Sequence, residues 1–149
     1  MTYQLIYSSR FSRIGGGPSN AIRNILERSE TNNFRDDITG FLIFDKSVFI
    51  QILEGDQAAV LETYGRIGED PRHTDLTVID RRQIDVRAFS GWSMGGHLAS
   101  HETRGIFARY GVDGDIDPAG LDAPRVLALA QDLLAFEMRR KAQRVLGAA

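Results

Sequence analysis

The pattern of apolar and polar positions predicts a series of short β-strands. Near the N-terminus the two kinds alternate loosely, so that Tyr3, Leu5 and Tyr7 share one face of a strand. The segments 38–44 and 48–53 are almost wholly apolar, which is typical of strands buried on both faces. The remaining expected strands span residues 76–82 and 92–94.

Two helices are predicted between these strands because apolar residues recur three and four positions apart. Ser19 is a suitable N-cap for the first helix, which is expected to reach Thr31 and to end at residues 32–33. Asp56 is a suitable cap for the second helix, which is expected to reach about Ile67.

The C-terminal part of the chain predicts a third, longer helix. Residues 15–18 (three glycines and a proline) and residues 111–122, which are rich in glycine, aspartate and proline, are expected to be loops. Pro124 suits the first turn of a helix that continues to about Leu146. Its broad apolar stripe comprises Val126, Leu127, Leu129, Ala130, Leu133, Leu134 and Met138.

The order of elements predicts an α+β fold with a ferredoxin-like βαββαββ mixed sheet. Right-handed crossovers place the first two helices on one face of the sheet, and the C-terminal helices are expected to cover the other. The first and third strands then lie side by side at the centre. Residues 1–98 are expected to form one domain, and residues 99–149 a helical extension packed on it.

Composition narrows the classes of function. The 149 residues are 42% hydrophobic and 26% charged, as in an ordinary globular domain. The net charge of −2 argues against nucleic-acid or anionic-membrane binding. The absence of cysteine excludes disulfides and is consistent with a cytoplasmic location. We expect neither a signal peptide nor a membrane span.

Gln51 is the most informative single residue. It lies in the apolar run 48–53, where its amide needs hydrogen-bond partners. An unpaired amide there would cost about 1–3 kcal/mol. Tyr7, on the neighbouring central strand, is one candidate partner. The pattern alone leaves open whether the network is purely structural or also includes a bound polar molecule.

Other residues suggest a ligand site between the two helices. Ile25 and Ile67 lie on facing stripes, and Phe49 shares the strand face of Gln51. Apolar walls with a few polar groups suit a flat heteroaromatic ligand, but taken by themselves these residues favour ordinary core packing. A cluster at the end of the second helix could meet a phosphate or be a solvated loop: Arg66, Asp70, Arg72 and His73. His97 and His101 lack a third ligand, so no metal site is expected.

Taken together, the motifs resemble those of the BLUF family, sensors of blue light using flavin. They are, in order, Leu5-Ile6-Tyr7-Ser8-Ser9, Asn32-Asn33, Ile38-Thr39-Gly40-Phe41-Leu42, Phe49-Ile50-Gln51-Ile52-Leu53-Glu54-Gly55, Asp70-Pro71-Arg72-His73 and Trp92-Ser93-Met94. They extend from residue 3 to about residue 95, which makes residues 1–98 the expected flavin-binding domain.

The resemblance implies a noncovalent flavin, FAD or FMN, held between the two helices. Tyr7 would give an electron and a proton to the excited flavin, and Gln51, which bridges the two, would rotate or tautomerise. The oxidised flavin would then be left in a changed hydrogen-bond network. The other flavin contacts that the resemblance implies are Asn33 and Asn32 at the ring edge, Ile25 and Ile67 beside the ring, Phe49 near it, and Arg72, His73 and Asp70 at the phosphate end.

The resemblance also implies a sensor that turns over no substrate. Trp92 and Met94 are expected to carry the change at Gln51 to the rest of the molecule, and which of them faces the flavin is left open. No further domain is expected, so the output would pass to an effector protein or through a homo-oligomer. The alternatives are a small phosphate-ester or acyl phosphate hydrolase and a ligand-free interaction module.

Overall fold

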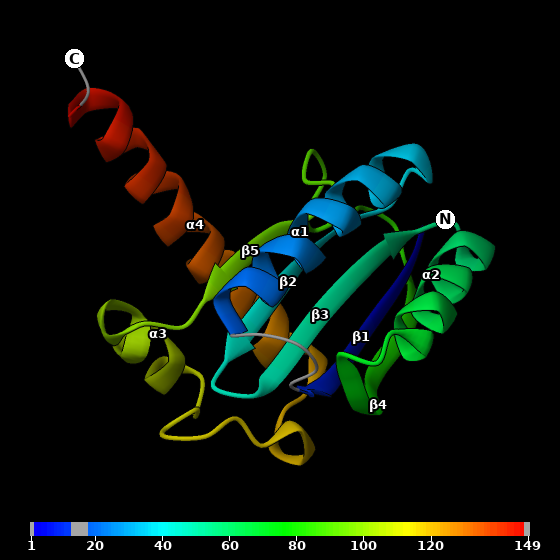
Figure 1. The fold of residues 1–149 in the computed structure, drawn as a ribbon, viewed down its shortest axis with the longest axis horizontal. Helices are drawn as coiled ribbons and strands as arrows, with labels where there is room; N and C mark the ends of the chain where they lie inside the picture. Colours follow the sequence, from blue (N-terminus) through cyan, green and yellow to red (C-terminus); the bar gives the residue numbers. More distant parts are fainter. Residues whose placement is uncertain (1, 13–17, 148–149) are drawn as a thin grey trace.

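The computed structural model describes residues 2–12 and 18–147 of the chain (Figure 1). The strands are β1 (Thr2–Phe11), β2 (Thr39–Asp45), β3 (Val48–Gly55), β4 (His73–Ile84) and β5 (Gly95–Leu98). The helices are α1 (Pro18–Arg35), α2 (Gln57–Glu69), α3 (Arg104–Arg109) and α4 (Ala123–Gly147), with 3-10 turns at His101–Thr103 and Pro118–Gly120.

The strands form one mixed sheet in the order β4-β1-β3-β2-β5. Only the β2–β5 pair is parallel among the described pairings. Helices α1 and α2 lie on one face of this sheet, and α4 crosses the other (Figure 1). The predicted α+β, ferredoxin-like fold is confirmed, including the central position of β1 beside β3.

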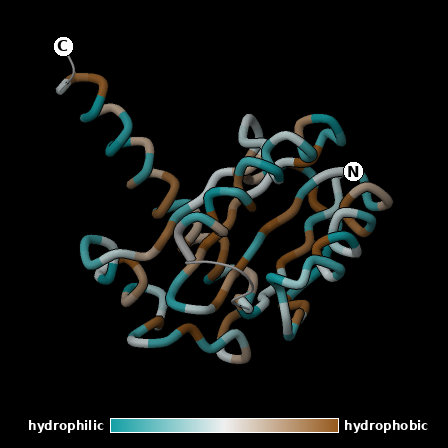
Figure 2. The backbone as a smooth tube through the Cα atoms, viewed as in Figure 1, coloured by the Kyte–Doolittle hydropathy of each residue, from teal (hydrophilic) through white to brown (hydrophobic). Residues whose placement is uncertain are grey.

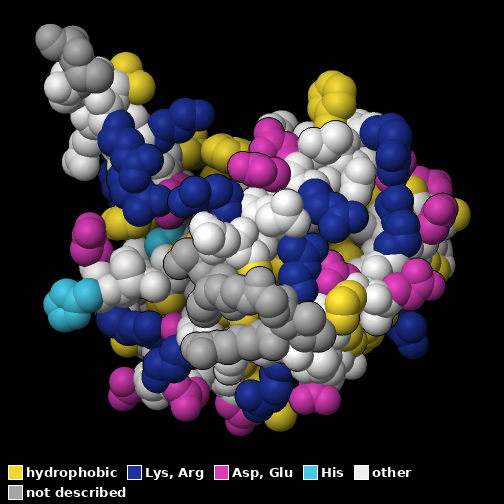
Figure 3. Space-filling view, in the orientation of Figure 1, with side chains coloured by type: hydrophobic (Ala, Val, Ile, Leu, Met, Phe, Trp, Pro, Cys, Tyr) yellow, Lys and Arg dark blue, Asp and Glu magenta, His cyan; other side chains and the backbone are white. Residues whose placement is uncertain are grey.

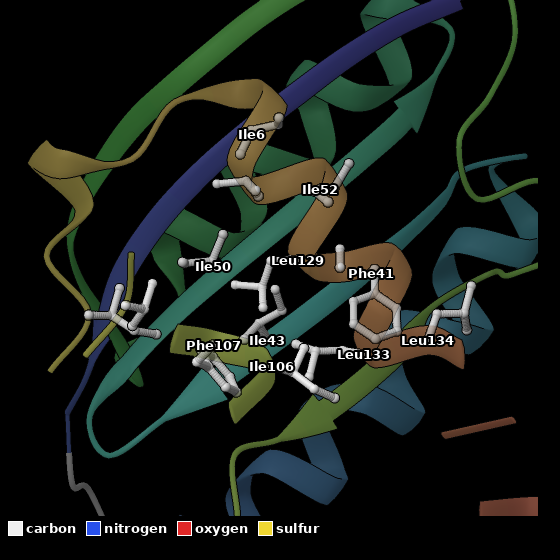
Figure 4. Close-up of a cluster of buried hydrophobic side chains, with 14 of the residues drawn as sticks. Ile6, Phe41, Ile43, Ile50, Ile52, Ile106, Phe107, Leu129, Leu133 and Leu134 are labelled. Atoms are coloured by element: carbon white, nitrogen blue, oxygen red, sulfur yellow. The ribbon is translucent and has the colours of Figure 1, made fainter. Parts of the chain in front are cut away.

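Alternate residues of the central strands supply two separate apolar layers. Ile50 and Ile52 of β3 pack with Leu129 and Leu133 of α4, whereas Phe49 packs with the residues under α1 and α2. Figure 4 shows the layer between α4 and the sheet, and Figure 2 shows hydrophobic stretches along the central strands. Both faces of the sheet are therefore covered by helices.

Helix α1 extends beyond its predicted ends at both termini. It begins at Pro18, so Ser19 lies inside the helix and does not precede it as a cap. It reaches Arg35, so Asn32 and Asn33 lie within it. Ile38 N donates to the Asn33 carbonyl at 2.8 Å, and this contact closes the helix two residues later than the asparagines suggest. Pro18, predicted as the last residue of the loop 15–18, is instead the first residue of the helix, and residues 15–17 lie outside the described residues.

Two other segments differ from the prediction. β4 already begins at His73 and continues to Ile84 because it pairs with β1 along most of its length. The fifth strand begins only at Gly95, so Trp92 and Met94 precede it in irregular structure. Met138 was expected in the buried stripe of α4 but is 53% exposed, because that end of the helix has passed beyond the sheet.

Candidate functional site

A cleft of about 140 Å³ opens between α1 and α2 above the centre of the sheet. α1 and α2 supply its side walls, and Gln51 of β3 reaches it from below. Lys and Arg side chains gather over this part of the surface (Figure 3). The lining residues are Ile25, Arg28, Ser29, Asn32, Asn33, Gln51, Thr63, Arg66, Ile67, Asp70, Arg72 and His73.

The floor of the cleft contains the Tyr7–Gln51 pair. The two residues are directly opposite in the antiparallel β1–β3 ladder, and both are buried. The Tyr7 hydroxyl donates to Gln51 Oε1. Burial, reinforced by the neighbouring Tyr64 phenol, raises the pKa of Tyr7 well above its ordinary value. Tyr7 therefore remains a neutral phenol and a hydrogen-bond donor at physiological pH.

The other end of the Gln51 amide faces Met94. Gln51 Nε2 donates to Met94 Sδ at 3.5 Å, and a thioether sulfur is only a weak acceptor. Asn33 at the end of α1 holds this segment, because its Nδ2 donates to the Ser93 carbonyl at 2.9 Å. The amide of Gln51 thus has one strong partner and one weak partner.

Trp92 and Met94 lie on opposite sides of the sheet. Met94 packs in the layer under α1 and α2, whereas Trp92 packs against the layer under α4. In the strand predicted over residues 92–94 the two side chains would share one face, and the structure does not bear this out. Alternation applies to regular strands, and these residues precede β5 in a segment that is anchored by long-range hydrogen bonds.

Ion pairs and hydrogen bonds cross the rim of the cleft. Arg72 makes a bidentate contact with Asp70 and donates through Nη1 to Asn24 Oδ1 of α1 at 3.0 Å. The Arg72 guanidinium lowers the pKa of Asp70, so that carboxylate remains ionised. Arg66 of α2 donates to Asp36, just beyond α1, at 3.0 Å. These contacts bridge the two walls.

His73 lies at the inner end of the cleft beside Phe49. Its Nδ1 is 2.8 Å from Ser9 Oγ, and its ring centroid is 4.7 Å from that of Phe49. Burial lowers the pKa of His73 to about 4, although Asp70 acts in the opposite direction. At neutral pH this imidazole is uncharged, so any contact with an anion is a hydrogen bond and not an ion pair.

The structure brings most of the predicted site residues together in the cleft. Tyr7 and Phe49 do not line it; they are fully buried beneath the lining residues. The sequence prediction did not include Arg28, Ser29 and Thr63, and it placed Arg66 only in a cluster that could meet a phosphate or be a solvated loop. A helical-face signal could have found them: Arg28 and Ser29 lie three and four positions after Ile25, and Thr63 lies four positions before Ile67.

Glu54, at the far end of β3 from the β2–β3 turn, is a further buried polar residue of this region. It is 0% exposed and accepts hydrogen bonds from the backbone N–H groups of Ala88 and Phe89 at 2.8 and 2.9 Å. Gln4 Nε2 donates to it at 2.9 Å and the Thr39 hydroxyl at 3.3 Å. Glu54 thereby ties β3 to the segment between β4 and β5, which leads to Met94.

His97 and His101 do not converge. His97 is buried in β5 with Nδ1 2.7 Å from Glu137 and Nε2 3.0 Å from the Thr103 hydroxyl, whereas His101 is exposed. Within residues 2–12 and 18–147 no group of three or more potential metal ligands was found. In the same part of the chain, every helix is too short or too polar to span a bilayer.

The chain is similar to known light-responsive proteins. The family model described as BLUF, sensors of blue-light using FAD, matches residues 2–95. Subunit beta of the photoactivated adenylate cyclase of Euglena gracilis is 37% identical over 71 residues, which is 47% of this chain and 8% of that protein. The chain therefore covers less than a tenth of the length of this curated relative.

Two solved structures share the fold over most of the chain. The photo-activated state of BlsA matches with a TM-score of 0.79 and 25% identity. The match covers 90% of this chain and 95% of the BlsA chain. The dark state of BlrB, described as a BLUF protein, matches with a TM-score of 0.69 and 29% identity. This match covers 87% of this chain and 96% of the BlrB chain. In both cases the similarity extends beyond β5 and into the C-terminal helices.

Proposed function

The chain belongs to the BLUF family of sensors of blue-light using FAD, and from this premise we propose which of its residues hold the flavin and carry the signal. As a member of this family it is a flavin-binding blue-light sensor that signals to partners, and not an enzyme. The hydrolase and the ligand-free module are not favoured. The roles of individual residues are the subject of the proposal.

The chemistry of the cleft suits a flavin. Ile25 and Ile67 are apolar walls on facing helices, and Gln51, Asn32 and Asn33 provide amides at the polar edge. Flat heteroaromatic ligands are bound by such apolar walls with a few polar groups. The single observation that carries the proposal is the amide of Gln51, which is hydrogen-bonded to Tyr7 on one side and, among the described residues, has only a sulfur acceptor on the other.

Asn33 and Asn32 are assigned to the carbonyl and imide edge of the ring. Asn33 also holds Ser93 through Nδ2, so one residue joins the ring edge to the segment that carries Met94. A displacement of Asn33 is therefore passed directly to Met94. Phe49 supports His73 from below and shapes the inner end of the cleft.

Tyr7 and Gln51 are the photoactive pair. A bound oxidised flavin would supply the absorption of blue light and the capacity to take up an electron and a proton reversibly. Tyr7 is the donor, and its elevated pKa keeps the proton on the phenol in the dark. Exchange of the carbonyl and amino ends of Gln51 turns Tyr7 from donor to acceptor, because Gln51 then presents N–H groups to the phenol. The same exchange removes the N–H donor from Met94.

The rim of the cleft supports FAD over FMN. Arg28, Arg66 and Arg72 line a second hollow of about 500 Å³ next to the cleft, together with the carboxylates of Glu69 and Asp70. Guanidinium groups bind phosphate through paired N–H donors, and three of them suit a pyrophosphate better than a single phosphate. Arg28→Ala is therefore expected to weaken FAD binding more than FMN binding, measured by flavin fluorescence during reconstitution.

We further propose that residues 1–98 form the flavin-binding domain and that residues 99–149 are the output segment. Met94 immediately precedes β5, and β5 contacts α4 through His97 and Glu137. A change at Gln51 has a short path to α4 by this route. The recipient is an effector protein, and a homo-oligomer is the second route for the output.

The test is a visible spectrum of the protein reconstituted with FAD, before and after blue light. We expect a small red shift that recovers in the dark. Tyr7→Phe and Gln51→Leu each retain flavin and lose the normal shift. Tyr3→Phe is the matched control, because Tyr3 lies on the same strand face and its change removes only a distant hydroxyl. A normal photocycle in either active-pair variant would contradict the assigned roles.

A further inference from the structure

The C-terminal end of α4 projects away from the body of the protein. The first half of the helix is buried against the sheet through residues such as Leu129 and Leu133. Every residue from 138 to 147 is exposed, and Figure 1 shows this part of α4 extending beyond the sheet edge. Residues 138–147 are called the projecting end below. Three of its apolar side chains are 53%, 67% and 76% exposed: Met138, Val145 and Leu146.

The apolar residues of the projecting end lie on one face of the helix. Met138, Ala142, Val145 and Leu146 follow the spacing i, i+4, i+7, i+8, which places them on one face of the helix. This is the spacing by which helices insert into apolar grooves of other proteins. The basic residues are Arg139, Arg140, Lys141 and Arg144.

The projecting end has a charge opposite to that of the rest of the chain. It contains four of the eighteen basic residues and none of the twenty acidic residues, so the remainder has fourteen basic and twenty acidic residues. Arg140 is paired with Glu137 at 2.7 Å, whereas Arg139, Lys141 and Arg144 have no ion-pair partner among the described residues. Figure 3 shows this cluster of Lys and Arg side chains on the projecting helix.

Two hydrogen bonds connect α4 to the segment that follows the photoactive residues. Gln131 Nε2 donates to the Ala88 carbonyl at 2.9 Å, and Glu137 lies 2.7 Å from His97 of β5. Glu137 immediately precedes the projecting end. A displacement of β5 after Met94 therefore reaches the base of the projecting end through one side-chain pair.

We propose that the projecting end docks into an apolar groove with an acidic rim on a partner protein. We expect the affinity of this docking to differ between the dark and the illuminated protein. That difference rests on the proposed function, whereas the docking itself does not. The apolar stripe favours a protein groove over nucleic acid, because contacts with a phosphate backbone would not bury the exposed side chains of Val145 and Leu146. It lacks the aromatic anchors that are common in helices lying on a membrane surface. Like charges disfavour pairing of two projecting ends with each other.

The experiment uses the full chain with flavin and a fluorescein-labelled helical peptide of about 20 residues, roughly 30 Å long, with leucines on one face and glutamates at its edges. Binding is followed by fluorescence anisotropy at two salt concentrations. We expect saturable binding that Lys141→Glu/Arg144→Glu weakens about tenfold. Val145→Ser/Leu146→Ser is expected to weaken it to a similar extent. The matched control is Arg23→Glu/Arg81→Glu, which reverses two exposed charges away from α4.

Several outcomes would overturn the proposal. These are no binding of the peptide, equal weakening by the control variant, or preferential binding to anionic phospholipid vesicles or duplex DNA. Self-association through the projecting end, seen by sedimentation and lost in the charge variant, would also overturn it. The absorption shift is measured in the same samples. A normal photocycle with equal affinity in dark and light would refute the light dependence, whereas a missing photocycle would refute the proposed function.

Discussion

Removing the carboxylate of Glu54 is expected to damage both stability and signalling. Glu54 lies three residues after Gln51 and accepts four hydrogen bonds, two of them from the backbone of Ala88 and Phe89. Phe89 N is buried, so water cannot replace the lost acceptor in Glu54→Ala. The segment between β4 and β5 would lose its attachment to β3.

The size of the effect can be estimated from these contacts. A buried donor that loses its partner costs about 1–3 kcal/mol, so the two buried donors, Phe89 N and Gln4 Nε2, together cost about 4 kcal/mol. Removal of the desolvation cost of the buried carboxylate offsets part of this, so about 3 kcal/mol remains. A domain has only about 5–15 kcal/mol of stability, and the loss corresponds to roughly 10 °C in Tm. Glu54→Gln, which keeps one carbonyl acceptor, should lose about half as much.

Urea unfolding in the dark measures the stability, and the flavin absorption shift measures the light response of the same samples. Glu62→Ala is the matched control, because Glu62 is exposed on α2 and its change should alter stability by less than about 0.5 kcal/mol. We expect Glu54→Gln to keep the flavin but to alter the recovery of the light state. If Glu54→Ala is as stable as the control, the carboxylate does not hold this segment.

Three further outcomes follow from the buried residues. Because the pKa of His73 is about 4 in the folded protein against 6.5 ordinarily, unfolding is favoured as the pH falls below about 6.5, by up to roughly 3 kcal/mol near pH 4. His73→Gln should flatten this part of the stability profile, and an unchanged profile would contradict the assignment. Met94→Leu conserves volume, so it should lower the free energy of unfolding by less than about 1.5 kcal/mol. It should nevertheless change the rate of dark recovery by up to about tenfold, because Gln51 loses its sulfur acceptor. Met138→Leu, at an exposed site, should leave that rate unchanged. Leu133→Ala should cost about 2–5 kcal/mol in urea unfolding, with the flavin spectrum intact, and a smaller loss would mean that α4 is not firmly packed.

The central part of the site could be predicted because regular strands follow simple rules. Handed crossovers place β1 beside β3, and the register then makes Tyr7 and Gln51 direct partners. Alternation also places Phe49 on the same face as Gln51. Ile25 and Ile67 were predicted from helical stripes, whose spacing is equally regular.

The irregular parts could not be predicted because their causes are long-range. The segment before β5 is fixed by Glu54 and Asn33, which are far away in sequence. No local pattern therefore separates Trp92 from Met94. Asn33 has a weak helix propensity, but the contact from Ile38 N keeps α1 helical past it. Met138 continues the apolar stripe of α4, and only the position of the sheet edge shows that the residue is uncovered.

The two-layer role of β3 limits how the gene for such a protein can change in length. Its residues alternate between the cleft, which Gln51 faces, and the layer under α4, which Ile50 and Ile52 face. Deletion or insertion of one codon within Val48–Gly55 would exchange these faces for the rest of the strand. A single-codon change here would therefore be as damaging as replacing Gln51 itself.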